Sequence, residues 1–136
     1  MGASALAAAF LLPACGAEGG DGGADAAAPP SPAIELRVDF FPKEAGAGGE
    51  SATLTCDPVG GTHPRPGEAC AALDTHPEAP DAVPPDAVCT QIYGGDETAT
   101  VTGVVHGQDV DASFNRTNGC EIARWDALAP LLDLRR

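Results

Sequence analysis

The sequence predicts an α+β domain in which helices pack on an antiparallel sheet. The first observation is a set of four short segments that are β-branched or alternate apolar with polar residues, as half-buried strands do, at residues 34–40, 51–56, 98–105 and 109–114. The second is a pair of helix-compatible stretches, at residues 67–74 and 120–134. The third is composition: only 4% of the 136 residues are aromatic, so the core is expected to be small and to need covalent support.

The four predicted strands form two antiparallel pairs. Residues 34–40, IELRVDF, alternate between apolar and charged side chains, and residues 51–56, SATLTC, repeat the pattern more weakly. The glycine-rich segment 44–50, EAGAGGE, has the composition of a connecting loop. Residues 98–105 and 109–114 flank the tripeptide His-Gly-Gln, which suits a tight turn. These last two segments are the clearest hairpin in the chain.

The centre of the chain is expected to hold one short helix and a long loop. Residues 67–74, GEACAALD, favour about two helical turns, pinned by Cys70. Residues 75–87, THPEAPDAVPPDA, cannot sustain a helix or a central strand, because each proline lacks a backbone N–H and fixes φ. They are predicted to form a loop that leads into Cys89.

The C-terminal part is expected to form an amphipathic helix on the sheet. Ile122, Trp125 and Leu128 recur at helical spacing, and Pro130 is expected to limit the helix. We interpret Trp125 as a core residue rather than as a platform for a ligand.

The N-terminal residues are expected to be a targeting segment and a tether. Residues 1–14 form a short apolar run that ends in small residues, which predicts a secretory signal peptide. The Leu-Pro-Ala-Cys sequence that ends at Cys15 resembles the lipobox of bacterial lipoproteins, so Cys15 is a candidate for acylation. Ordinary secretion and an unprocessed apolar tail are the alternatives. Residues 15–32, rich in Gly, Ala, Asp and Pro, predict a flexible tether, which leaves residues 33–136 as the folded domain.

The remaining cysteines predict two disulfide bonds, because an even number in an exported chain favours pairing. They are Cys56, Cys70, Cys89 and Cys120. Their spacing leaves three pairings open. A metal site is the rival interpretation, but the sequence has no CxxC motif and its histidines show no ligand spacing. Neither a metal nor another cofactor is therefore expected.

Charge and motifs exclude several classes of function. The net charge of −13 disfavours a nucleic-acid partner, because no basic patch is available to meet phosphates. The sequence has no GxSxG or HExxH motif, and no unpaired cysteine in its folded part, so we do not expect an enzyme. Contact with a membrane is expected only through a lipid on Cys15. The expected location is extracellular, either secreted or lipid-anchored at the outer face of the bacterial cell membrane.

Three segments, taken in order, carry a resemblance to a known family. They are TLTCDPVGGTHPRPGEACAAL at residues 53–73, VCTQIY at 88–93 and TNGCEIARW at 117–125. The Cys-x13-Cys spacing around Gly-Thr-His-Pro, the Cys-x-x-x-Tyr spacing and the Asn-x-Cys-Glu sequence resemble the subtilisin inhibitor-like family, of the Streptomyces type. The resemblance covers about residues 34–127.

The resemblance implies both a fold and a function. It implies disulfides Cys56–Cys70 and Cys89–Cys120, a five-stranded antiparallel sheet with two short helices, and a homodimer formed through the sheet. It further implies tight, reversible inhibition of a secreted serine protease, subtilisin-like or trypsin-like. We expect Cys56–Cys70 to stabilise the domain without an inhibitory role.

The same resemblance implies roles for the residues around Cys89. The reactive bond would join Gln91 and Ile92, two residues after this cysteine. Gln91 would enter the primary specificity pocket of the protease. The other predicted members of the protease-binding loop are Val88 and Thr90, in the fourth and second upstream subsites, together with Cys89 and Tyr93, of which Tyr93 would support the loop.

This sequence departs from the family at several positions. Gln91 stands where family members commonly carry Met, Lys or Arg, and Thr90 stands where they often carry Pro. The neutral amide offers neither charge nor apolar area, so the resemblance implies the mechanism more than the target. Residues 93–103, YGGDETATVTG, introduce two glycines that favour flexibility, and the C-terminal APLLDLRR also differs.

Two other functions are consistent with the sequence. The fold could serve as a cell-surface binding module without inhibitory activity. Gln91 could also be the acyl donor for a secreted transglutaminase, an enzyme class associated with the family.

Overall fold

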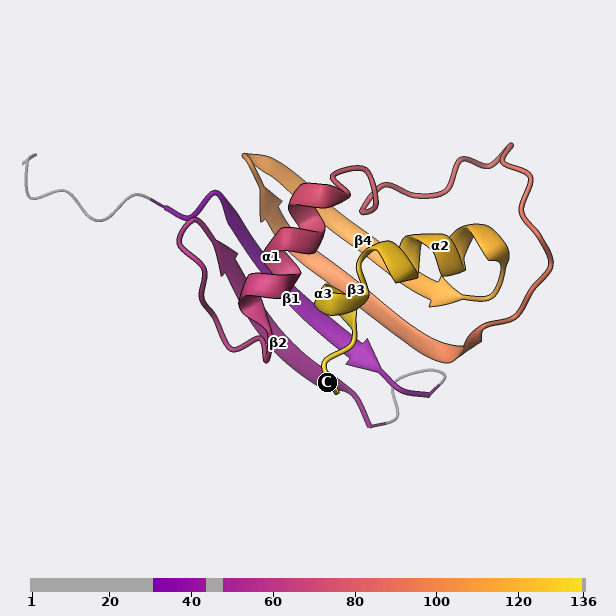
Figure 1. The fold of residues 1–136 in the computed structure, drawn as a ribbon, viewed down its shortest axis with the longest axis horizontal. Helices are drawn as coiled ribbons and strands as arrows, with labels where there is room; N and C mark the ends of the chain where they lie inside the picture. Colours follow the sequence, from indigo (N-terminus) through magenta and orange to yellow (C-terminus); the bar gives the residue numbers. More distant parts are fainter. Residues whose placement is uncertain (1–30, 44–47, 136) are drawn as a thin grey trace, which may run out of the picture. The chain divides into compact units, whose positions relative to one another are not determined.

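The computed structural model describes residues 31–43 and 48–135, which form an antiparallel sheet with helices on one face (Figure 1). The expected signal peptide at 1–14, Cys15 and nearly all of the expected tether at 15–32 lie outside these described residues. Within the described part, no helix is both long and apolar enough to cross a membrane.

The sheet has the strand order β2-β1-β3-β4, and every neighbouring pair is antiparallel. The strands are β1 (Ile34–Phe41), β2 (Glu50–Cys56), β3 (Gly95–Val105) and β4 (Gln108–Arg116). The α+β class and the antiparallel sheet are confirmed. The described residues nevertheless form four strands rather than the five that the resemblance implies. Between the first helix and β3 the chain is rich in proline, which cannot donate to a ladder, and this segment forms no strand.

The hairpin between β3 and β4 closes on a two-residue turn. Val105 pairs with Gln108, so the turn consists of His106 and Gly107 alone. Both have positive φ, 48° and 80°, which matches a type I′ turn and the right-handed twist of the strands. Gln108, which we expected in the turn, is therefore the first residue of β4.

Three helices cover one face of the sheet, namely α1 (Pro66–Thr75), α2 (Gly119–Ala127) and α3 (Ala129–Leu132). We expected two, and α3 is the additional one. The end of α2 at Ala127 confirms that Pro130 limits this helix, since Pro130 has no N–H to continue the helical ladder; the proline instead starts a new turn near the N-terminus of α3.

The core lies between these helices and the sheet. The inward side chains of β1 are at most 3% exposed: Ile34, Leu36, Val38 and Phe40. Trp125 on α2 is 4% exposed and its ring centroid lies 6.2 Å from that of Phe40, so its interpretation as a core residue is confirmed. The alternate side chains of β1 are exposed or half-buried and lie on the other face of the sheet, which the described helices leave uncovered.

A buried histidine joins the loop after β2 to the C-terminal helix. His63 is 4% exposed; its Nε2 lies 2.9 Å from Leu131 O, and its Nδ1 accepts from Arg65 N at 3.0 Å. The neutral ring with the proton on Nε2 satisfies both contacts. Burial disfavours the charged form and lowers the pKa of His63, and nearby Arg65 lowers it further.

Candidate functional site

Residues 87–94 form an exposed loop without helix or strand between the proline-rich segment and β3. Among the described residues, three of the five exposed large apolar side chains lie here: Val88 (98% exposed), Ile92 (56%) and Tyr93 (62%). Exposed apolar side chains concentrated in one segment mark a surface that binds a partner. The predicted site residues Val88, Cys89, Thr90, Gln91, Ile92 and Tyr93 all fall within this loop.

A disulfide ties the upstream half of the loop to α2. Cys89 pairs with Cys120 in the first turn of that helix, with the Cα atoms 5.3 Å apart. One residue later, the carbonyl of Thr90 accepts from Gly119 N at 2.8 Å. Both implied disulfides are therefore confirmed, since Cys56 also pairs with Cys70. The upstream half is held by a covalent bond and a backbone hydrogen bond at adjacent residues.

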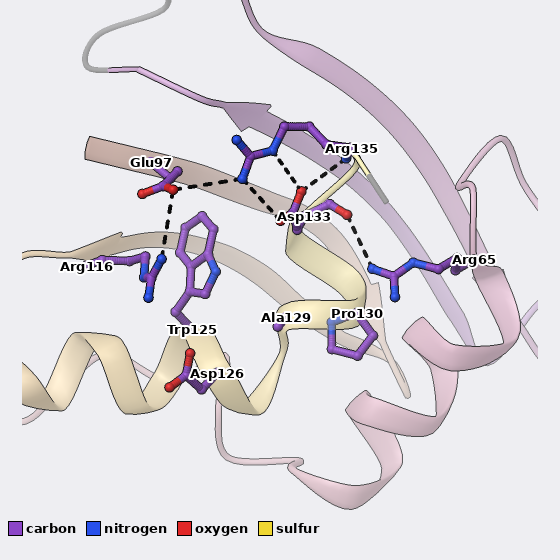
Figure 2. Close-up of a pocket in the computed structure, with 9 residues that line it drawn as sticks. All are labelled: Arg65, Glu97, Arg116, Trp125, Asp126, Ala129, Pro130, Asp133 and Arg135. Atoms are coloured by element: carbon purple, nitrogen blue, oxygen red, sulfur yellow. Dashed lines mark hydrogen bonds and ion pairs between the residues drawn. The ribbon is translucent and has the colours of Figure 1, made fainter. Parts of the chain in front are cut away.

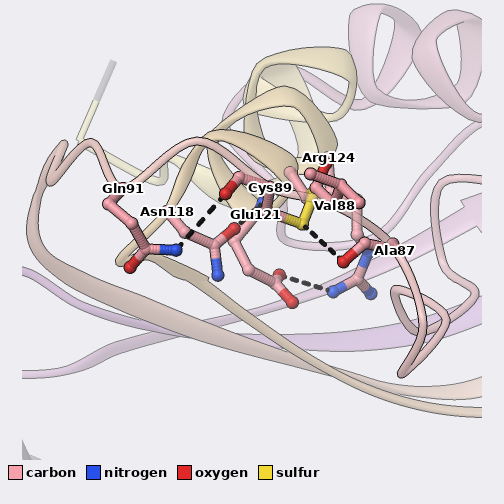
Figure 3. The surroundings of a disulfide bond; sticks show 8 residues. Ala87, Val88, Cys89, Gln91, Asn118, Glu121 and Arg124 are labelled. Carbon is pink, nitrogen blue, oxygen red and sulfur yellow. Dashed lines mark hydrogen bonds and ion pairs between the residues drawn. A yellow bond between two sulfur atoms is a disulfide. The ribbon is translucent and has the colours of Figure 1, made fainter.

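The N-terminus of α2 is shaped to receive this part of the loop. Asn118 caps the helix, since its Oδ1 accepts from Glu121 N at 3.0 Å (Figure 3). Gly119 has no side chain, and a Cβ there would collide with the side chain of Thr90. The Asn-Gly-Cys sequence thus combines a helix cap, a close backbone approach and the disulfide.

The downstream half of the loop is held by backbone contacts and not by a disulfide. Gly94 N donates to Arg116 O at 2.7 Å, and Gly95 pairs with Arg116 at the start of β3. A Cβ on Gly94 would lie 3.0 Å from the side chain of Ile122. Gly94 therefore permits close approach to β4 and α2, which is a packing role that the sequence did not reveal.

Gln91 lies between the two tethered halves and is exposed. Its Nε2 donates to the carbonyl of Cys89 at 3.3 Å, so the amide folds back along the upstream half (Figure 3). The peptide bond from Gln91 to Ile92 is thus flanked on one side by the disulfide and on the other by the Gly94–Arg116 hydrogen bond.

Arg124 makes a set of contacts beside the loop that sequence reasoning missed. Its side chain is only 11% exposed; it donates from Nε to Ala79 O at 3.0 Å and from a terminal nitrogen to Pro80 O at 3.2 Å. It also pairs with Glu121 at 2.8 Å and lies 4.4 Å from the centroid of the Phe114 ring. Arg124 therefore fastens the proline-rich segment to α2 one helical turn after Cys120.

The described residues contain no group of three or more His, Cys, Asp or Glu side chains that could hold a metal ion. What the loop offers instead is an exposed backbone with polar and apolar side chains, fixed at both ends. Such a segment is suited to occupying the extended substrate groove of another protein. The fold and the site together define a small disulfide-linked domain that presents a constrained loop.

Comparisons of the sequence with protein families and curated proteins agree with this class. The family model described as subtilisin inhibitor-like matches residues 34–118. The chain is 40% identical over 80 residues to subtilisin inhibitor-like protein 1 of Streptomyces cacaoi, covering 55% of this chain and 72% of that protein. A crystal structure of Streptomyces caespitosus sermetstatin in complex with Bacillus licheniformis subtilisin is similar at 24% identity and a TM-score of 0.45, covering 71% of this chain and 96% of that one.

The chain belongs to the subtilisin inhibitor-like family. This is a family of protease inhibitors, so the expectation that the chain is not an enzyme is confirmed by its membership.

Proposed function

We propose that the protein inhibits a secreted serine protease of the subtilisin type through a reactive bond between Gln91 and Ile92. The observation that carries this proposal is the position of that bond on an exposed loop, two residues after a disulfide and two residues before a backbone anchor. Membership of the subtilisin inhibitor-like family adds the class of target.

The two tethers explain how such a loop would inhibit rather than be consumed. A serine protease binds its substrate as an extended strand, and a loop already held in place loses little entropy on binding. If the protease cut after Gln91, Cys89–Cys120 would hold the new carboxyl end and the Gly94–Arg116 hydrogen bond would hold the new amine near it. An amine kept close to an acyl-enzyme has a high effective concentration, so the bond re-forms.

The side chains of the loop suggest the selectivity of the inhibitor. Gln91 would occupy the primary pocket, where its amide needs hydrogen-bond partners to replace water. Val88, which is 98% exposed, would add apolar area in the fourth upstream subsite. Thr90 packs against Gly119 and would have its side chain constrained before binding. A broad subtilisin-like protease fits this loop better than a trypsin-like one, which requires a cation.

The N-terminal segment and the uncovered sheet face complete the proposal. Residues 1–14 would direct export and Cys15 would carry a lipid, so the inhibitor would act at the outer face of the cell membrane on the tether 15–32.

The open face of the sheet holds a shallow groove of about 490 Å³ that includes Thr53, Thr102 and Val104. A homodimer through this face would bury it and leave the loop at 87–94 free.

The test is a titration of the full chain, with its disulfides formed, against subtilisin and trypsin. Intact-mass analysis of each mixture then locates any cut. We expect stoichiometric loss of subtilisin activity, with a small fraction of the inhibitor cut between Gln91 and Ile92.

Two results would contradict the proposal. Rapid cleavage at this bond without inhibition would make the loop a substrate. No inhibition with the chain intact would favour a binding module on the same fold. For the alternative that Gln91 is the acyl donor of a transglutaminase, amine labelling of the wild type that persists in a Gln91→Asn variant would rule it out.

A further inference from the structure

A cluster of charged side chains lies beneath the downstream half of the loop. Glu97 is the central member, placed just after the loop at the start of β3, with 20% of its side chain exposed. Its Oε1 lies 3.8 Å from a guanidinium nitrogen of Arg116 on β4 and 3.8 Å from one of Arg135 in the C-terminal tail (Figure 2). Three segments far apart in the sequence thus meet at one carboxylate.

Glu97 also packs against the backbone of the loop's end. Gly95 has a φ of +144°, and a Cβ there would collide with the Glu97 carboxylate. The register of the β3–β4 ladder shifts between Gly95 and Ala99, so Glu97 lies inside an irregular stretch of the strand. The Glu97 carboxylate therefore occupies the space that a side chain at position 95 would need.

Arg116 connects the same carboxylate to the loop's anchor. Its carbonyl accepts the hydrogen bond from Gly94 N, and its guanidinium faces Glu97. Arg135 is fixed on the other side, because it donates to Asp133 Oδ1 at 3.1 Å and its guanidinium lies 4.8 Å from the centroid of the Phe40 ring. The C-terminal tail is thereby joined through Glu97 to the backbone that holds the loop.

The hydrogen-bonding of this cluster is incomplete. Glu97 Oε2 and Arg116 Nε are buried and have no hydrogen-bond partner among the described residues. Both residues line a cavity of about 330 Å³, together with Trp125, Asp126 and Arg135. Loosely paired, partly exposed charges contribute little to global stability. A cluster of this kind is better suited to holding one segment in place than to stabilising the whole fold.

We infer that Glu97 is a positioning residue that, with Arg116 and Arg135, holds Gly94 and Gly95 so that the downstream end of the Gln91–Ile92 bond stays in register. The upstream end has a disulfide and the downstream end has none, so this cluster supplies the missing constraint. This role rests on the proposed function, but the positioning of Gly94 and Gly95 by Glu97 can be measured in the free protein.

The first experiment uses no protease. Amide hydrogen exchange of Gly94 is measured in the full chain, its Glu97→Gln variant and an Asp126→Asn control, which removes a charge from the same cavity. We expect exchange in Glu97→Gln to be about threefold faster or more, the size expected when two partly exposed ion pairs are lost, and unchanged in Asp126→Asn. Amides of β1 should exchange at the wild-type rate in both variants.

Four results would overturn the inference, and three of them come from the single variants. They are unchanged exchange at Gly94 in Glu97→Gln, an equal increase in Asp126→Asn, or an equal increase in β1, which would indicate general destabilisation.

Arg135→Gln should reproduce part of the effect. Combined with Glu97→Gln, it should add less than its separate effect, because the two residues share one interaction. Full additivity would also contradict the inference.

The second experiment separates this inference from the proposed function. Each variant is incubated with subtilisin, and the fraction cut between Gln91 and Ile92 is followed with time. We expect Glu97→Gln to be cut about threefold faster than wild type or more, in line with its exchange rate. Faster Gly94 exchange in a chain that never inhibits subtilisin would support the positioning role and contradict the proposed function. Unchanged exchange with full inhibition would contradict only the positioning role.

Discussion

The two disulfides of this domain have the same chemistry and different surroundings. Cys56 and Cys70 are 3% and 6% exposed and join the end of β2 to α1 inside the core. Cys89 and Cys120 are only partly buried and join an exposed loop to the first turn of α2. The first bond connects two elements that already pack together, whereas the second constrains a segment with no regular structure of its own. The two bonds therefore differ because of where they lie: Cys56–Cys70 stabilises the core, whereas Cys89–Cys120 constrains the loop.

Removing the loop disulfide is the strongest way to test this difference. In a Cys89→Ser, Cys120→Ser variant the upstream half of the loop retains only the Thr90–Gly119 hydrogen bond. We expect inhibition of subtilisin to fall by about 100-fold or more and the loop to be cut and released, because about 3 kcal/mol of constraint is lost from the bound segment. Inhibition constants and the rate of cleavage at Gln91–Ile92 measure both effects.

The matched control is the other pair, whose loss should act on stability. For Cys56→Ala, Cys70→Ala, with a sequence separation of 14 residues, we expect a loss of about 3 kcal/mol in the free energy of unfolding. Inhibition by the folded fraction should stay at the wild-type level. Denaturant unfolding and titration below the midpoint measure the two quantities. Equal losses of inhibition in the two double variants would show that the disulfides are not divided in role.

Arg124 extends the comparison to non-covalent contacts, because it fastens the segment that leads into the loop. Arg124→Met keeps the aliphatic stem but removes the donors to Ala79, Pro80 and Ser113. We expect a loss of about 2 kcal/mol in unfolding free energy, since several partly buried carbonyls lose a charged donor. Limited proteolysis should then cut residues 77–87 more readily.

The control for this prediction is Arg37→Met, on the exposed face of the sheet, where Arg37 pairs with Asp39 at 2.9 Å. It should change neither the susceptibility of the proline-rich segment nor, beyond a few tenths of a kcal/mol, the stability. If the two variants gave identical proteolysis patterns, Arg124 would not be the residue that holds the proline-rich segment against α2.

The strands and the proline-rich segment could be predicted because their signals are local. The alternation in IELRVDF and the β-branched run before the His-Gly turn depend only on neighbouring residues, and the structure confirms both strands. The irregular segment at residues 75–87 follows from its prolines, which exclude regular structure wherever they cluster, whereas the roles of the loop residues after it follow from the family resemblance. The disulfide pairing came from the family resemblance and not from spacing, because four cysteines permit three arrangements.

The contacts that hold the loop could not be predicted, because they join distant residues. Arg124 donates to carbonyls 44 and 45 positions earlier, and nothing near it in the sequence marks those partners. Glu97 and Arg135 likewise meet only after the sheet and the C-terminal tail have formed. Pro130 predicts the end of α2, but the short helix α3 after it could not be predicted, because four residues are too few to give a helical pattern.

The smallest expected effect concerns His63, which joins the loop after β2 to α3 without any covalent bond. Its pKa is lower in the folded state than the value of about 6.5 typical of an unfolded chain. The unfolded state therefore binds more protons, so the stabilisation is complete above about pH 6.5 and is lost as the pH falls through the folded pKa. Each unit of lowering corresponds to about 1.4 kcal/mol at most.

Unfolding free energies measured between about pH 5 and 7.5 should therefore decrease towards acid in the wild type, at a pH where most carboxylates remain charged. His63→Gln keeps a donor for Leu131 O but cannot titrate, so its stability should be lower at pH 7.5 and less dependent on pH. The control is His106→Asn, in the exposed hairpin turn, where Asn tolerates positive φ. A pH slope unchanged in His63→Gln would mean that another group responds to acid, and that the contact with α3 contributes equally in both protonation states.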